Sequence, residues 1–153
     1  MSDIKEIAIS ELPDNNVAPS LIDDASILLS QEAHEGYVSP EKVRNRIEEG
    51  RMIVAIDQVV GLVGAGLLRL TGETTASITG VAISPQYRGK GLGTKIITEL
   101  EKLAEDEQVR TIYLTPTNKR AERLYERLGY RVPNSEMLTM EKTLPVSHHE
   151  STK

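Results

Sequence analysis

The sequence predicts a single α/β domain of the α+β class, because segments with strand and helix character alternate along almost the whole chain. Four stretches carry apolar residues at helical spacing, and the segments between them are short, apolar and rich in β-branched residues. The predicted order is β-α-α-β-β-β-α-β-α-β-β. The length of 153 residues fits one domain, and no repeat or linker divides it. We expect this domain over residues 1–144 and a disordered polar tail over residues 145–153.

The N-terminal third is predicted to contain one strand and two helices. Residues 4–9 include a short apolar run that Pro13 ends. Between Ala18 and Gln31, apolar residues recur at helical spacing. Ser39-Pro40 begins a second helix, because a hydroxyl N-cap followed by proline is typical of helix starts, and Gly50 ends it.

The middle of the chain is predicted to hold three strands and a long helix. Met52–Ile56, Val59–Leu70 and Thr74–Ile83 are apolar segments separated by short polar breaks. Gly91–Glu107 carries a regular apolar stripe, which indicates a helix with one buried face.

The C-terminal part is predicted to hold three short strands and one helix. Thr111–Leu114 has the composition of a buried strand. Asn118–Leu128 carries apolar residues on one helical face, and Gly129 follows it in the position where helices usually end. Tyr130–Val132 and Met137–Lys142 are predicted as closing strands.

Composition excludes several classes of protein. The chain has no cysteine, which rules out disulfides, thiolate metal sites and cysteine nucleophiles. Its net charge of -5 and its 3% aromatic content argue against a nucleic-acid-binding protein. The longest weakly polar run, Val59–Leu68, is much shorter than the roughly 20 residues that span a bilayer. The N-terminus shows no signal-peptide pattern, so we expect a cytoplasmic protein without membrane partners.

The candidate functional segment is the glycine-rich run Val81–Thr94. Gly89, Gly91 and Gly93 alternate, so the backbone there is free of Cβ crowding and successive N–H groups can converge on one anion. The helix that begins near Gly91 adds its positive end. Arg88 and Lys90 add formal charge. A pyrophosphate matches a site of this kind.

Other glycine-rich motifs fit this segment less well. The dinucleotide fingerprint requires a third glycine where this chain has Thr94 or Ile96, depending on the register. A P-loop requires Ser or Thr after its lysine, and Lys90 is followed by Gly91. A flexible surface turn remains the alternative, although it needs neither the two cations nor the three glycines.

Two motifs resemble those of a known family. Arg88-x-x-Gly91-x-Gly93 resembles the R/Q-x-x-G-x-G/A signature of the GCN5-related N-acetyltransferases, the GNAT superfamily. The segment Asn118–Tyr130 is similar to that family's late N-x-x-A-x-x-x-Y-x-x-x-G-F/Y segment. The resemblance covers about Ile4 to Lys142 and implies a mixed, mostly antiparallel central sheet flanked by helices.

The resemblance also implies a binding site for acetyl-CoA. In the family, the strand before the loop offers backbone N–H groups to the pantetheine arm and the thioester, and Gly80 would mark a bulge in that strand. The loop amides hold the pyrophosphate. Asn118 matches a contact of the CoA arm and is also a plausible helix N-cap. The implied acetyl-CoA-binding residues are Val81, Ala82, Ile83, Arg88, Gly89, Lys90, Gly91, Leu92, Gly93, Thr94 and Asn118.

Tyr125 is the implied catalytic residue. It matches the tyrosine that, in many members, protonates the departing thiolate of CoA, a role that a phenol with a pKa near 10 can fill. The alternative is that Tyr125 only belongs to the apolar stripe of its helix, with its hydroxyl hydrogen-bonded locally. The implied reaction is direct transfer, in which an amine attacks the thioester and backbone N–H groups near Val81 stabilise the oxyanion.

The general base and the acceptor are less determined. Many members carry a glutamate on the strand before the loop, but this chain has no acid between Thr75 and Ile83. His34, Glu35 and Glu73 are candidates by neighbourhood only, so we assign no base. The family's acceptor pocket corresponds to about Gln31–Tyr37, whose acidic composition favours a cationic amine.

The sequence thus predicts an N-acetyltransferase that moves an acetyl group from acetyl-CoA to a primary amine of a small molecule or peptide, without a metal. A non-catalytic acyl-CoA sensor is the alternative, because the strand glutamate is missing. Family members often dimerise, so a homodimer is consistent with the resemblance.

Overall fold

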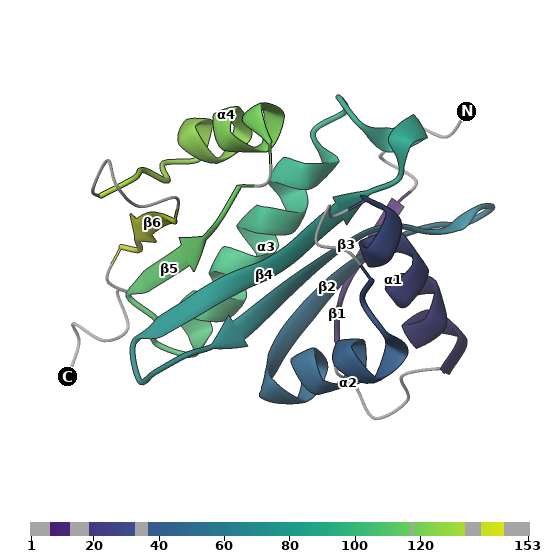
Figure 1. Cartoon of the computed structure of the whole chain (residues 1–153), viewed down its shortest axis with the longest axis horizontal. Helices are drawn as coiled ribbons and strands as arrows, with labels where there is room; N and C mark the ends of the chain where they lie inside the picture. Colours follow the sequence, from purple (N-terminus) through teal and green to yellow (C-terminus); the bar gives the residue numbers. More distant parts are fainter. Residues whose placement is uncertain (1–6, 13–18, 33–36, 117, 134–138, 146–153) are drawn as a thin grey trace.

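A six-stranded sheet with helices on both faces forms the body of the protein in the computed structural model (Figure 1). The structure describes residues 7–12, 19–32, 37–116, 118–133 and 139–145. The strands are β1 (Ile7–Leu12), β2 (Gly50–Asp57), β3 (Gly61–Leu70), β4 (Thr75–Ile83), β5 (Thr111–Leu114) and β6 (Met140–Thr143). They lie in chain order across the sheet, and all neighbours are antiparallel except β4 and β5, which are parallel. The predicted fold class is confirmed.

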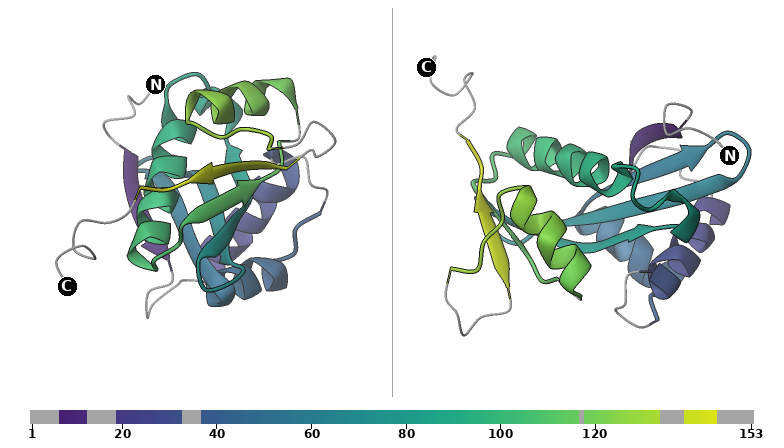
Figure 2. Two further views of the ribbon diagram at one scale, coloured as in Figure 1. Left: turned by 90° about the vertical axis from the view of Figure 1, so that its left-hand side faces the viewer. Right: turned by 90° about the horizontal axis from the view of Figure 1, so that it is seen from above.

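Two layers of helices cover the sheet, as the views in Figure 2 show. The helices are α1 (Pro19–Glu32), α2 (Pro40–Glu49), α3 (Leu92–Asp106) and α4 (Lys119–Arg127), with a short 3-10 turn, η2 (Pro85–Tyr87). Helices α1 and α2 bury one face of the sheet through residues such as Leu29 and Val43. Helix α3 buries the other face through Ile96 and Leu100. None of the helices in the described ranges is long and apolar enough to cross a membrane.

Close packing of α3 on β3 depends on Gly66. A Cβ at this position would lie 2.6 Å from Ile96 Cγ2 and 2.8 Å from Leu100 Cδ1, which no real contact tolerates. The glycine therefore lets the helix approach the strand directly, and it fixes α3 and the loop before it against the sheet.

Strand β4 contains a bulge at Thr79. Leu67 pairs with Gly80 and Leu68 with Ile78, so Thr79 is the extra residue. The bulge predicted at Gly80 is confirmed, although its extra residue is Thr79, one position earlier. Because a bulge reverses the alternation of side chains along a strand, Ile78 and Val81 both lie on the α3 face.

Strands β4 and β5 separate beyond their first residues. They pair only over Thr75–Ser77, opposite Thr111–Tyr113. Within the described part of the chain, the edge of β4 from Ile78 to Ile83 has no strand partner on the β5 side. The sheet therefore opens into a wedge, with the backbone of β4 along one wall.

Several predicted boundaries differ from the structure. Strand β3 begins at Gly61 because the carboxylate of Asp57 accepts hydrogen bonds from the N–H groups of Val59 and Val60 and forms a turn. Tyr130–Val132 is not a strand, since only Arg131 pairs there, in one isolated bridge to Glu141. The start of the predicted strand Met137–Lys142, the first residues of the chain and the tail after residue 145 lie outside the described residues.

Candidate functional site

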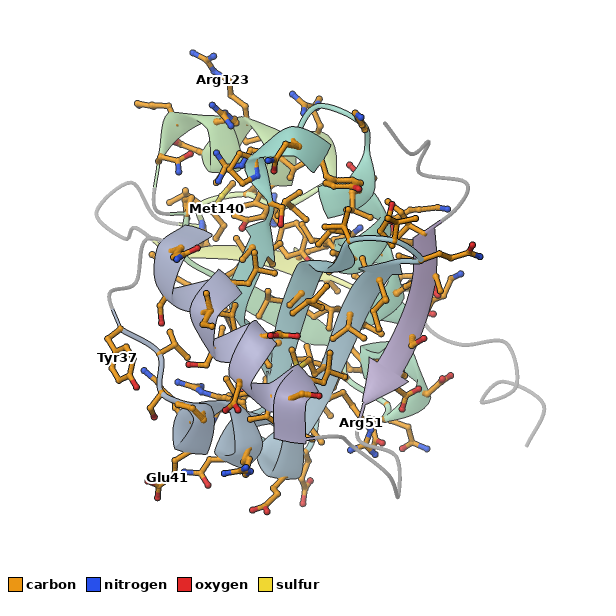
Figure 3. All side chains as sticks on the ribbon, turned by 90° about the vertical axis from the view of Figure 1, so that its right-hand side faces the viewer. Tyr37, Glu41, Arg51, Arg123 and Met140 are labelled. Carbon is orange, nitrogen blue, oxygen red and sulfur yellow. The ribbon has the colours of Figure 1, made fainter. Side chains whose placement is uncertain are left out.

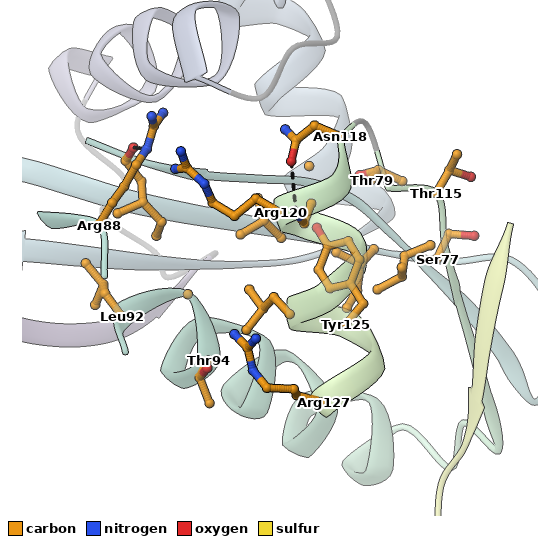
Figure 4. A pocket seen from close by; sticks show the side chains of 18 of the residues that line it. Ser77, Thr79, Arg88, Leu92, Thr94, Thr115, Asn118, Arg120, Tyr125 and Arg127 are labelled. Atoms are coloured by element: carbon orange, nitrogen blue, oxygen red, sulfur yellow. Dashed lines mark hydrogen bonds between the residues drawn. The ribbon is translucent and has the colours of Figure 1, made fainter. Parts of the chain in front are cut away.

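A cleft of about 1250 Å³ occupies the wedge between β4 and β5. Its walls come from β4, the glycine-rich loop, the start of α3, β5 and α4 (Figure 4). Ten of the residues predicted from the sequence line it: Val81, Ile83, Arg88, Gly89, Gly91, Leu92, Gly93, Thr94, Asn118 and Tyr125. The fold thus brings the two sequence motifs to one place, although about thirty residues separate them.

Two predicted binding residues do not line the cleft. Ala82 points to the opposite face of the sheet, where it is buried among the residues that face α1 and α2. The alternation of side chains along β4 requires this, because Val81 and Ile83 face α3. Lys90 lies with its Nζ 5.5 Å from the centre of the Tyr87 ring, in a cation–π contact. For these two positions only the backbone remains as a candidate binding group.

The glycine-rich loop depends on two left-handed residues. Gly89 has φ of 76° and Gly91 has φ of 84°, values that residues with a Cβ rarely adopt. A Cβ on either glycine would meet nothing within 4 Å, so relief of crowding within the protein is not why glycine is needed there. Gly91 is the N-cap of α3 and has no side chain to accept from the first N–H groups of the helix. Those donors are therefore available to an anion in the cleft.

A buried aspartate, Asp57, holds the loop against the sheet. Tyr87 donates from its hydroxyl to Asp57 Oδ2 at 2.9 Å, and Asp57 is only 1% exposed. Arg88 Nε donates to the carbonyl of Ile83 at 3.3 Å, which ties the loop to the end of β4. Asp57 could not be found from the sequence, because it lies thirty positions before Tyr87.

Replacing Tyr87 with phenylalanine is expected to lower the free energy of unfolding by about 1–3 kcal/mol, because a buried carboxylate loses a hydrogen-bond donor. Urea denaturation measures the change. Tyr37→Phe serves as the matched control, since Tyr37 is 77% exposed and points away from the body of the protein (Figure 3). Equal stability of the two variants would show that the Tyr87–Asp57 contact contributes nothing.

Two tyrosines lie together near the inner end of α4, but only one of them reaches the cleft. Tyr125 lines the cleft, and its ring packs edge-to-face with that of Tyr130, with the two centroids 6.2 Å apart. Tyr130 is not part of the lining, and its hydroxyl donates to Glu101 Oε2 at 2.9 Å. Lys142 Nζ also donates to Glu101, at 3.2 Å.

Burial, and then the neighbouring Glu101 carboxylate, raise the pKa of Tyr130 far above its ordinary value. Tyr130 therefore stays protonated and contributes to the packing of the core.

The raised pKa of Tyr130 predicts how stability depends on pH. Above pH about 10, the unfolded chain releases the Tyr130 proton and the folded chain keeps it. The free energy of unfolding should then fall by about 1.4 kcal/mol per pH unit from this group, whose contribution is complete at lower pH. In Tyr130→Phe this slope should be absent, and stability at neutral pH should be lower by about 1–3 kcal/mol. Denaturation at several pH values checks both, and parallel curves for the two proteins would refute the assignment.

Asn118 caps α4. Its Oδ1 accepts from the N–H of Ala121 at 2.8 Å (dashed in Figure 4), so the predicted N-cap is confirmed. The residue also lines the cleft. Capping and contact with a bound molecule are compatible, because the cap uses only the amide oxygen.

The lining is basic, which the sequence did not reveal. Although the chain carries a net charge of -5, the described lining contains no Asp, Glu or His. Its cations are Arg46, Arg69, Arg88, Lys119, Arg120 and Arg127. They come from four separate segments, so no local pattern of charge could have found them. A basic cleft on an acidic protein attracts anions selectively.

A buried hydroxyl also faces this region. Thr79 lines the cleft at the bulge, and its Oγ1 is buried without a hydrogen-bond partner among the described residues. Because such a group is costly to leave unpaired, it is suited to bond a molecule in the cleft.

Of the residues named as possible bases, only Glu73 is among those that the structure describes, and it does not join this lining. Glu73 is exposed in the turn between β3 and β4 and is not part of the described lining. His34 and Glu35 lie outside the described residues. No group of three or more His, Asp or Glu within the described ranges could hold a metal ion.

Comparison with known proteins agrees with this geometry. A model of the acetyltransferase (GNAT) family matches residues 19–130. The chain is 30% identical to a crystal structure of aminoglycoside 6′-acetyltransferase type Ii, with a TM-score of 0.74, over 92% of this chain and 99% of that one. It is 25% identical, with a TM-score of 0.75 and the same coverage, to an aminoglycoside 6′-N-acetyltransferase complexed with coenzyme A.

A more distant likeness extends to a protein-modifying enzyme. The ribosomal-protein-S18-alanine N-acetyltransferase of Escherichia coli is 20% identical, with a TM-score of 0.71, over 92% of this chain and 96% of that one. At this level of identity the likeness concerns the fold alone.

Proposed function

The chain belongs to the GNAT family of acetyl-CoA-dependent N-acetyltransferases, and from this premise we propose that it transfers an acetyl group from acetyl-CoA to a primary amine of a small molecule or peptide. The observation that carries the proposal is the single cleft, in which the glycine-rich loop, the open edge of β4 and Tyr125 meet.

We assign the anionic end of acetyl-CoA to the loop. The left-handed Gly89 and Gly91 turn the backbone so that the first N–H groups of α3 face the cleft, and these would hold the pyrophosphate. Arg88, Lys119 and Arg120 lie in the same lining and supply positive charge for the phosphate of acetyl-CoA that is not part of the pyrophosphate. These residues fit acetyl-CoA, because hydrogen-bond donors and cations gather where its phosphates, the most negative part of the molecule, would lie.

We assign the acyl arm to the unpaired edge of β4. An extended amide chain can hydrogen-bond such an edge as a further strand would. The backbone of Val81 then faces the thioester, and the buried Thr79 hydroxyl lies at the adjacent bulge, where it gains a partner. N–H groups at this point would stabilise negative charge on the carbonyl oxygen during transfer.

Tyr125 is the proton donor that we propose for the departing thiolate. It reaches the cleft from α4, opposite β4 (Figure 4), and it is 9% exposed, so water competes little for its hydroxyl. Tyr130 is unsuited to this role, because its proton is already shared with Glu101. The described lining offers no Asp, Glu or His to take the proton of the attacking amine, so we assign no base.

Calorimetric titration with acetyl-CoA, followed by a thiol-release assay over a broad panel of amines, tests this function. The panel includes aminoglycosides, because a protein 30% identical to this chain is named for such acceptors, and peptides with a free amino terminus. We expect binding and turnover of at least one amine. Absence of acetyl-CoA binding would refute the proposal, and binding without turnover would favour an acyl-CoA sensor.

A further inference from the structure

A row of polar side chains crosses the sheet at the end of the cleft farthest from the glycine-rich loop. Arg69 on β3 pairs with Ser77 on β4, and Ser77 pairs with Tyr113 on β5. All three line the cleft. The next position in the row is Glu141 on β6, which pairs with Tyr113 but is not among the lining residues.

This row lies on the face of the sheet that α1 and α2 cover. The neighbours of each member in the chain, such as Leu68, Ile78 and Ile112, are buried in the core with α3. Because side chains alternate along a strand, Arg69, Ser77 and Tyr113 point to the opposite face. Arg46, from the last turn of α2, lines the cleft from that same side. Gly50, which directly follows α2, pairs with Arg69, so the last turn of α2 and Arg69 lie at the same end of the sheet.

These arginines are too far from the loop to serve the pyrophosphate. Ser77 precedes Ile83 by six positions along β4, which corresponds to roughly 20 Å of extended strand. Ser77 is only two positions, or about 7 Å, from the bulge at Thr79, which lies next to Val81, whose backbone we place at the thioester. A molecule whose amine lies at the bulge can thus reach Arg69 with a second group several bonds away.

Resting on the proposed function, we propose that the acceptor is a small molecule that carries a carboxylate as well as its reacting amine, and that Arg46 and Arg69 bind this carboxylate. Guanidinium groups match carboxylates in shape and charge. The hydroxyls of Ser77 and Tyr113 add donors beside Arg69. An acceptor with a second positive charge at this end would be repelled by the two guanidinium groups.

Three primary amines test the proposal: 6-aminohexanoate, hexylamine and hexane-1,6-diamine. They have carbon chains of the same length and differ in the group at the end opposite the reacting amine, which is anionic, neutral or cationic. We expect kcat/KM to be highest for the anionic end and lowest for the cationic end. Arg46→Ala and Arg69→Ala should each reduce kcat/KM for 6-aminohexanoate by about 10- to 100-fold, the effect of losing a hydrogen bond to a charged group. Hexylamine should be affected little by either change.

Matched variants separate binding from folding. Arg44→Ala removes an exposed arginine of α2 that is not part of the lining, and it should leave all three acceptors unchanged. Arg46→Lys and Arg69→Lys keep the charge and should restore part of the preference. Far-ultraviolet circular dichroism checks that each variant is folded. Calorimetry of the three amines with the CoA complex gives the same comparison if turnover is slow.

Equal or reversed preference among the three acceptors would overturn the inference, as would a preference that both alanine variants retain. Turnover of hexylamine in either case would leave the acetyltransferase function standing. A chain that neither binds acetyl-CoA nor releases its thiol would instead refute the proposed function, and the inference with it.

Discussion

Alanine at position 91 is expected to weaken acetyl-CoA binding by about 10- to 100-fold. Gly91 has φ of 84°, and a residue with a Cβ costs roughly 1–2 kcal/mol there. The loop can escape this cost only by turning its backbone, which moves the N–H groups at the start of α3 away from the anion that we propose they bind. Each hydrogen bond lost to a charged oxygen is worth about 1.5–3 kcal/mol. Isothermal calorimetry measures the Kd, and Gly89→Ala, at φ of 76°, should behave alike.

Gly61→Ala is the matched control for these variants. Gly61 also has positive φ, 97°, and a Cβ there meets nothing within 4 Å, but it lies at the β2–β3 turn outside the cleft lining. The three variants should lose similar stability in urea, while only those in the loop lose affinity. If Gly61→Ala weakens binding as much as Gly91→Ala, general destabilisation explains the effect and the loop assignment is wrong.

Phenylalanine at position 125 is expected to lower kcat by about 100-fold or more, while the Kd for acetyl-CoA changes little. General acid catalysis typically contributes factors of this size. The change removes only the hydroxyl and keeps the ring, which packs edge-to-face with Tyr130 at a centroid distance of 6.2 Å, so the packing of α4 should persist. Thiol-release kinetics at saturating acceptor measure the effect.

Tyr130→Phe provides the opposite pattern. It removes a hydroxyl that is bonded to Glu101 and lies outside the cleft lining, so turnover should be retained while stability falls. Full activity of Tyr125→Phe would exclude Tyr125 as the proton donor. Equal loss of kcat in both variants would mean that the two rings act by packing.

Most of the fold could be predicted from the sequence, because its signals are local. Helical spacing of apolar residues and the Ser39-Pro40 start depend on neighbours within one or two turns, and they placed α2 and α3 to within a residue or two. The prediction was wrong at Tyr130–Val132, where strand-like residues find only one bridge partner. Strand pairing is a contact with a distant segment, and composition alone does not report it.

Part of the site was predictable for the same reason. The three glycines and Arg88 lie within six positions, so their spacing alone indicated an anion-binding turn. Two of these glycines do occupy left-handed conformations, which is a property of the backbone at that point. A Cβ on either one would meet no other protein atom within 4 Å, so packing within the protein does not require glycine at these positions.

The sequence by itself determined the order of most elements, the family and the loop, since each depends on residues that lie close together along the chain. The tertiary structure alone decided which tyrosine faces the cleft, that Ala82 points away from it, that Asp57 anchors the loop through Tyr87, and that Arg46 and Arg69 both line it. These facts depend on the bulge in β4, on the divergence of β5 and on helices packed from both faces. Such long-range contacts set where side chains point, and no local pattern contains them.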